Sequence, residues 1–125
     1  MQNPSICIIT NCGQNFSGPV IQPFFRTILP ALRDKADEIR VVATATDVFA
    51  EFVSNGKTVA LKLHAEFQPF VASSRIRIAS GMSIMPTELQ TGSMQMIFEQ
   101  HRALVSVEIT RSTNTETLTM KLRWN

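Results

Sequence analysis

The chain has 125 residues, a length that suits one domain and buries about two-thirds of the surface of the unfolded chain. Twelve basic and ten acidic residues give a formal net charge of +2, which excludes the strongly basic composition of histone-like or membrane-coating proteins. No apolar run approaches the roughly 18 residues that span a bilayer. We therefore expect one folded domain, residues 1–125, with no membrane partner.

The two cysteines and the start of the chain predict the cellular compartment. Cys7 lies in an apolar run and Cys12 follows it near an expected turn, without a CxxC motif or a Cys/His cluster. The first residues, MQNPS, lack the basic start and the apolar stretch of a signal peptide. We expect two reduced thiols in an intracellular protein.

The first quarter of the chain predicts a strand, a loop and a helix. Residues 5–10 form a continuously apolar run, which is typical of a buried strand, and a polar loop follows. Over residues 20–32 apolar side chains recur at steps of three and four, which predicts a helix that ends near residues 34–37. Pro23 suits the helix start, whereas Pro30 should kink or end the helix.

The hydrophobic period changes to two from Glu38 onward. Residues 38–46, 48–54 and 57–67 alternate between apolar and polar side chains, as in strands of an antiparallel sheet. Between the second and third runs, Asn55-Gly56 supplies the positive φ angles of a type I′ turn.

The second half predicts more strands and a second helix. Residues 75–80 read as a short strand with Arg75 and Arg77 along one side, and residues 81–85 extend it. Residues 86–100 predict a second helix, with a strand over residues 94–98 as the alternative. Residues 103–111 and 116–124 form another hairpin. The expected fold is α+β, with antiparallel sheets backed by one or two short helices.

The sequence shows no arrangement typical of catalysis. His64 is expected on the outward side of a strand and His101 in a turn, and neither lies near a nucleophile elbow. The acidic residues are scattered, without metal-ligand spacing, and the five glycines form no phosphate-binding loop. We predict a protein that is not an enzyme, with no catalytic residue, no metal site and no cofactor.

The basic residues of the first helix are the candidate binding site. Arg26 and Arg33 are seven positions apart and therefore share a helix face, with Gln22 one turn earlier and Lys35 just beyond. Such a face can track phosphates because each neutralised phosphate releases counterions. The alternative is an ordinary solvated helix surface.

The order of these elements resembles one domain of the DNA sliding-clamp family, which includes the processivity clamp and the checkpoint clamp subunits. The first strand "SICIIT" and the helix over residues 20–32 match the start of such a domain. Residues 37–70 resemble the strands that follow, residues 75–99 the strand that leads into the second helix, and residues 104–124 the next hairpin. The resemblance covers nearly the whole chain and lies in periodicity and element order.

The resemblance implies a non-enzymatic scaffold of DNA replication or repair in the nucleus. Such a scaffold encircles duplex DNA, docks peptide partners and pairs with other subunits through sheet edges, as a homo- or hetero-oligomer. The DNA-binding residues that the resemblance implies are Arg26, Arg33 and Lys35. The chain would be half of a clamp subunit, with the last strand of the domain missing after Asn125. The expected second helix departs from the family because it carries no basic residue.

Two other interpretations stay open. A small cystatin-like or nuclear-transport-factor-like α+β domain would use its Met and Phe side chains to line a cavity for an apolar ligand, or would bind a protein partner. A plain interaction module would pair by its sheet edges. Either protein would be cytoplasmic.

Overall fold

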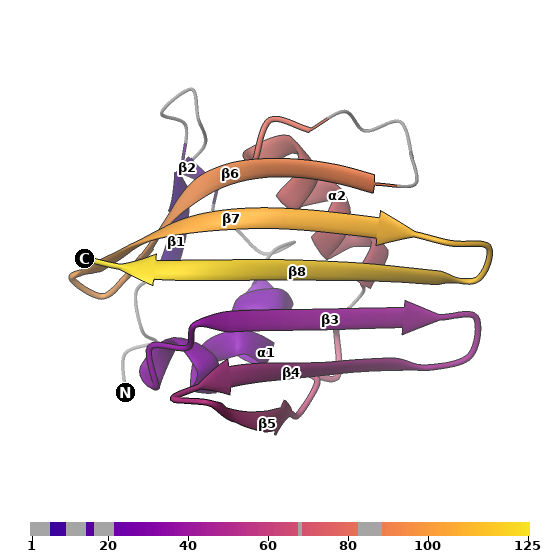
Figure 1. Cartoon of the computed structure of the whole chain (residues 1–125), viewed down its shortest axis with the longest axis horizontal. Coiled ribbons are helices and arrows are strands. Elements are labelled where there is room, and N and C mark those ends of the chain that lie inside the picture. The colour runs from indigo at the N-terminus through magenta and orange to yellow at the C-terminus, as the bar shows by residue number, and fades with distance from the viewer. Residues whose placement is uncertain (1–5, 10–14, 17–21, 68, 83–88) are drawn as a thin grey trace.

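The computed structural model describes residues 6–9, 15–16, 22–67, 69–82 and 89–125. One antiparallel sheet carries both helices on one face (Figure 1). The elements are β1 (Ile6–Ile9), β2 (Asn15–Phe16), α1 (Gln22–Arg33), β3 (Glu38–Thr44), β4 (Val48–Ser54), β5 (Lys57–Leu61), α2 (Pro69–Ala79), β6 (Leu89–Phe98), β7 (His101–Arg111) and β8 (Thr115–Trp124). The predicted α+β class, with an antiparallel sheet and two short helices, is confirmed.

The eight described strands follow the order β2-β1-β6-β7-β8-β3-β4-β5. Within this order, β3-β4-β5 and β6-β7-β8 are each consecutive in the chain, and each group follows a helix. The two groups join where β8 pairs with β3, from Glu38 opposite Lys121 to Thr44 opposite Thr115. This pairing makes the sheet continuous, and β5 lies at one of its edges.

Both hairpins predicted from alternation are confirmed. Asn55 and Gly56 have φ angles of 52° and 77°, as a type I′ turn requires, and Ser54 lies opposite Lys57 across the turn. In β8, Leu118, Met120 and Leu122 are buried. The alternating residues of β8 therefore face the core on one side and solvent on the other, as expected for a sheet covered on one face.

The apolar stripe of α1 builds the core under that helix. Phe24, Phe25, Ile28 and Leu32 are at most 1% exposed. Pro30 does not end the helix, which continues to Arg33. Because Pro30 lies on the exposed side of α1, water can hydrate the carbonyl that loses its helical donor.

The strand predicted over residues 75–80 is wrong, because residues 75–79 form the end of α2 and Ser80 follows in a turn. The alternation of Arg and Ile imitates a strand, but the buried residues Ser73, Ile76, Arg77 and Ser80 are spaced by one, three and four positions, as on one face of a helix. The strand expected over residues 57–67 is too long. It ends at Leu61, and the chain turns back onto α1.

The helix predicted over residues 86–100 is also wrong where the structure describes it. β6 occupies residues 89–98, with Met94, Met96 and Phe98 buried in alternation. The strand alternative for residues 94–98 is therefore confirmed and extended. Residues 83–88, including most of the expected extension over residues 81–85, lie outside the described residues. The short strand β2 was not predicted and falls in the expected loop.

The sheet has two different faces. The helix face carries the core side chains, and we call the opposite face the outer face. Alignment of the strand registers places outward side chains in rows across the strands. The central row runs Thr91, Glu108, Thr119, Arg40, Glu51 and Ala60. The outer face is therefore polar at its centre, and the described helices cover the other face (Figure 1).

Candidate nucleic-acid interface on α1

Three exposed cations, which we call the basic stripe, line the solvent side of α1 and its end: Arg26, Arg33 and Lys35. Arg26 and Arg33 lie on the side opposite the buried stripe of α1. Among the described residues, neither Arg33 nor Lys35 forms an ion pair. The structure thus exposes Arg26 and Arg33 on α1 and Lys35 just beyond the end of the helix.

The end of α1 fixes the position of Lys35. The amide of Lys35 donates to the carbonyl of Leu32 at 3.1 Å, and the amide of Ala36 donates to that of Ala31 at 2.9 Å. With a φ angle of 50° at Lys35, this pattern is a Schellman motif in which Lys takes the place usually held by Gly. A cation here is also favoured by the negative end of the helix dipole.

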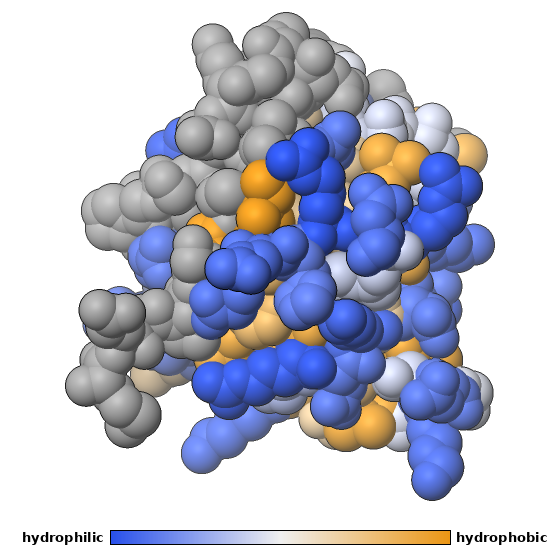
Figure 2. Space-filling model, turned by 90° about the vertical axis from the view of Figure 1, so that its left-hand side faces the viewer, coloured by the Kyte–Doolittle hydropathy of each residue, from blue (hydrophilic) through white to orange (hydrophobic). Residues whose placement is uncertain are grey.

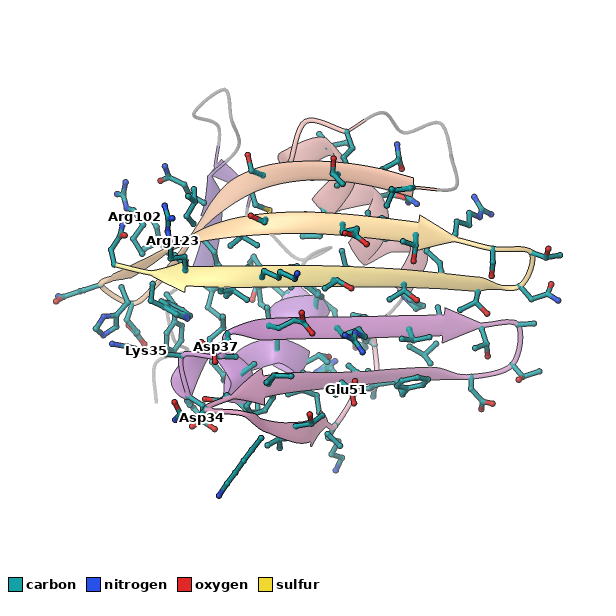
Figure 3. All side chains as sticks on the ribbon, viewed as in Figure 1. Asp34, Lys35, Asp37, Glu51, Arg102 and Arg123 are labelled. Atoms are coloured by element: carbon teal, nitrogen blue, oxygen red, sulfur yellow. The ribbon has the colours of Figure 1, made fainter. Side chains whose placement is uncertain are left out.

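Acidic residues flank part of the basic stripe. Asp34 and Asp37 are exposed on either side of Lys35, and Figure 3 shows all three at the same end of the sheet. Figure 2 faces this end, where strongly hydrophilic side chains cover much of the described surface. Arg26 has no acidic residue within three positions along the chain. Along the chain, Arg26 is the cation of the stripe that lies farthest from an acidic residue.

The segment over residues 62–67, which we call the strap, packs against α1 beside Arg26. The amide of His64 donates to Thr27 Oγ1 at 3.0 Å, and the Phe67 ring stacks on Phe24 with centroids 6.1 Å apart. His64 is half-buried in this strap and is not on the outward side of a strand, so that expectation is wrong. The alternation of apolar and polar residues through residue 67 predicts a strand. The contacts to Thr27 and Phe24 that bend the chain leave no mark in this sequence pattern.

The His64 ring lies between the strap and the basic stripe. Its Nδ1 accepts a hydrogen bond from the amide of Glu66 at 3.1 Å, and its Nε2 lies 3.5 Å from Arg26 Nη1. His101 is exposed at the first residue of β7, one position beyond the turn. Within the described residues, no hydrogen bond or ion pair joins either imidazole to a carboxylate, hydroxyl or thiol side chain, the groups that would complete a nucleophilic or acid–base site.

Arg77 is buried, contrary to the expectation that it lies along one side of a strand. Arg77 and Glu116 are 6% and 7% exposed and form an ion pair between α2 and β8. Arg77 Nε also donates to Gln90 Oε1 at 2.8 Å, and Ser73 Oγ donates to Glu116 Oε2 at 3.2 Å. These four residues, the α2 anchor, satisfy each other's polar groups, which makes their burial tolerable.

The outer face carries its own charges away from α1. Arg40 forms ion pairs with Glu38 at 3.0 Å and with Glu51 at 3.5 Å. Lys121 and Arg123 project from β8 on the same face, and Figure 3 shows Arg123 near Arg102 at the end of the sheet. A shallow depression of about 430 Å³ lies over β6, β7 and β8, lined by Thr91, Gly92, Ser93, Ser106, Val107, Glu108, Thr119 and Lys121.

An internal space lies on the helix face between the strap, α2 and the centre of the sheet. It measures about 10 Å³ and is lined by Val41, Ala43, Phe67, Pro69, Ser73, Glu116 and Leu118. That volume suits at most one water molecule, whereas small-molecule sites occupy about 300–1,000 Å³. This space is therefore not a ligand cavity.

The described part of the chain lacks two other kinds of feature. Residues 6–9, 15–16, 22–67, 69–82 and 89–125 include no group of three or more His, Cys, Asp or Glu side chains placed to hold a metal ion. Neither described helix is long and apolar enough to cross a membrane. The chain matches no model of a known protein family, and comparison with curated proteins gave no significant match.

Proposed function

We propose that the chain is a clamp-like scaffold of DNA replication or repair that binds duplex DNA through its backbone and docks partner proteins without catalysing a reaction. The observation that carries the proposal is the placement of both helices on one face of a continuous sheet, with Arg26 and Arg33 exposed on α1 (Figure 1). The order of elements agrees with the order that suggested the resemblance through β5. Beyond β5 it differs, because α2 replaces the strand expected over residues 75–80 and β6 replaces the helix expected over residues 86–100.

The geometry of α1 suits contact with phosphates. Seven residues of helix separate Arg26 and Arg33 by about 10 Å along the axis, which is about three base-pair steps of a duplex. A rigid helix holds both cations at this separation, because four large apolar side chains fix its other side in the core. Such contacts position a protein on DNA and carry no base specificity. The interface would therefore bind duplexes regardless of sequence.

We assign subunit pairing to the edge strand β5. In a hairpin with a two-residue turn, the flanking pair exchanges both backbone hydrogen bonds, here Ser54 and Lys57. By alternation, Val59 also bonds to β4, whereas Thr58 and Ala60 direct their N–H and C=O groups away from the sheet. Both residues are exposed. Four backbone groups are thus available to a strand of another subunit.

The outer face offers apolar side chains for peptide partners. Phe49 and Leu89 are 51% and 58% exposed. Strand registers place them at the two ends of one row, with Val42 and two threonines between them. Isolated apolar residues are common on surfaces, but a row rimmed by charges suits a docked peptide.

Duplex binding by the unmodified chain tests the proposal. Fluorescence anisotropy of a labelled duplex, measured over a range of salt concentrations, should show an affinity that falls steeply and linearly on a log–log plot. Duplexes of unrelated sequence should bind equally well. If no duplex binds at low salt, the clamp proposal is contradicted. A gain in thermal stability with a small apolar ligand would favour the pocket-protein alternative.

A further inference from the structure

We propose that Arg26 and His64 form a notch that binds one phosphate group, as a free anion or within a nucleic-acid backbone. The notch lies where the strap crosses the exposed side of α1. As a contact to duplex DNA it rests on the proposed function, because it would add a phosphate contact beside Arg33. As a site for inorganic phosphate it stands independently.

The hydrogen bonds of His64 define which ring nitrogen carries the proton. The amide of Glu66 donates to Nδ1 at 3.1 Å, so Nδ1 must offer a lone pair. A neutral imidazole has one donor nitrogen and one acceptor nitrogen, and its proton is therefore on Nε2. His64 Nε2 is then a donor that points away from the strap's backbone.

Two donors consequently converge without an acceptor between them. His64 Nε2 lies 3.5 Å from Arg26 Nη1, and a guanidinium cannot accept a hydrogen bond. The distance is at the limit for a hydrogen bond, and with the proton on Nε2 neither side chain can accept it. Neither side chain has an ion pair or another side-chain acceptor among the described residues. An oxygen that accepts from both N–H groups would complete the arrangement.

The chemistry of the notch selects a phosphate oxygen. An arginine and a neutral N–H donor together supply one positive charge and at least two directed donors, which suits an oxyanion with several acceptor oxygens. Arg26 is exposed and His64 is half-buried, so the notch is open to a ligand as large as a duplex. The exposed Glu66 carboxylate is the nearest internal competitor along the strap.

The imidazole is held in place before any ligand arrives. Thr27 Oγ1 accepts from the amide of His64 at 3.0 Å and donates to the carbonyl of Pro23 at 2.9 Å. The amide of Phe67 donates to the carbonyl of His64 at 2.9 Å, which closes a turn in the strap. Binding therefore has to order only the Arg26 side chain, and this lowers the entropic cost.

The direct test is an NMR titration of the full chain with inorganic phosphate at constant pH and ionic strength. Long-range proton–nitrogen spectra should show the proton of His64 on Nε2 before phosphate is added. Addition of phosphate should then shift Nε2 saturably, while the exposed ring of His101 serves as the internal reference. Arg26→Gln should weaken the binding about tenfold, as expected for loss of a charged hydrogen bond. Arg123→Gln, on the outer face of the sheet, should leave it unchanged.

Two results would overturn the notch: a proton on Nδ1 of His64, or a His64 ring that phosphate does not shift saturably. A parallel duplex titration separates the two proposals. Phosphate binding without duplex binding supports the notch and contradicts the proposed function. Duplex binding that His64→Ala leaves unchanged does the opposite.

Discussion

Arg77 of α2 and Glu116 of β8 form an ion pair buried between helix and sheet. The two residues are 39 positions apart in the sequence. Gln90 and Ser73 complete the hydrogen bonds of the pair. α2 is therefore held against the sheet by polar contacts as well as by Ile76 and Ala79, which are both fully buried. In contrast, α1 is held by large apolar side chains.

Arg77→Met should lower the free energy of unfolding by about 3–5 kcal/mol, because it leaves the carboxylate of Glu116 buried without its cation. Denaturant unfolding followed by the fluorescence of Trp124, the only tryptophan of the chain, measures this loss. The matched control is Arg40→Met, which removes the two partly exposed ion pairs with Glu38 and Glu51 and should cost about 0–1 kcal/mol. The double variant Arg77→Met/Glu116→Leu should recover part of the stability. Equal losses at Arg77 and Arg40 would contradict a structural role of the anchor.

Gly92→Ala should destabilise the protein because β6 passes close to the end of α2 at this residue. A Cβ at Gly92 would lie 2.3 Å from the carbonyl oxygen of Ser80, a backbone atom that cannot turn away. We expect a loss of about 1–3 kcal/mol in chemical denaturation, as for overpacking. Gly56→Ala is the comparison: nothing lies within 4 Å there, so its cost comes from the positive φ angle alone. A neutral Gly92→Ala would show that α2 and β6 are further apart.

Lys35→Gly should stabilise the fold while it removes one cation from the basic stripe. Lys35 holds a φ angle of 50° in the cap of α1, where glycine pays no steric cost. We expect a gain of up to about 1 kcal/mol, offset slightly by the lost charge at the helix end. The unfolding midpoint and duplex affinity of the variant should therefore move in opposite directions. A loss of stability would mean that the charge outweighs the backbone strain.

Ala60→Pro should block association through β5 without breaking the β4–β5 ladder. The N–H of Ala60 points away from β4 by the register, so proline removes a group that only a partner strand would use. If subunits pair through this edge, light scattering should show a smaller species than for the unmodified chain. Val59→Pro removes a hydrogen bond to β4 and should instead lower the unfolding midpoint. An unchanged oligomer in Ala60→Pro would exclude this edge as the interface.

Sequence patterns correctly predicted the elements that fit one hydrophobic period over their whole length. The stripe of α1, the Asn55-Gly56 turn and the alternation of β7 and β8 each depend only on residues that are close together in the sequence. α2 was missed because alternating Arg and Ile imitate a strand over six residues, and the buried partner of Arg77 is distant in the sequence. The sequence predicts a helix in place of β6 because the apolar residues of β6 also fit a helical period.

The candidate site likewise has one part that the sequence predicts and one part that it does not. The exposure of Arg26 and Arg33 follows from helix spacing, which sequence alone supplies. The approach of His64 to Arg26 depends on where β5 ends and how Thr27 and Phe24 hold the strap. No local pattern encodes those contacts, because they join segments almost 40 positions apart. The basic stripe was thus predictable and the notch beside it was not.

The central claim is that duplex DNA lies against α1, and a charge-reversal pair tests it most directly. Arg26→Glu/Arg33→Glu and Lys121→Glu/Arg123→Glu change the net charge equally, but on the helix face and on the outer face. Duplex affinity should fall strongly in the first variant, with a salt slope smaller by about 2 if both arginines meet phosphates, and little in the second. Equal effects of the two pairs would show that only net charge matters and would contradict an interface on α1.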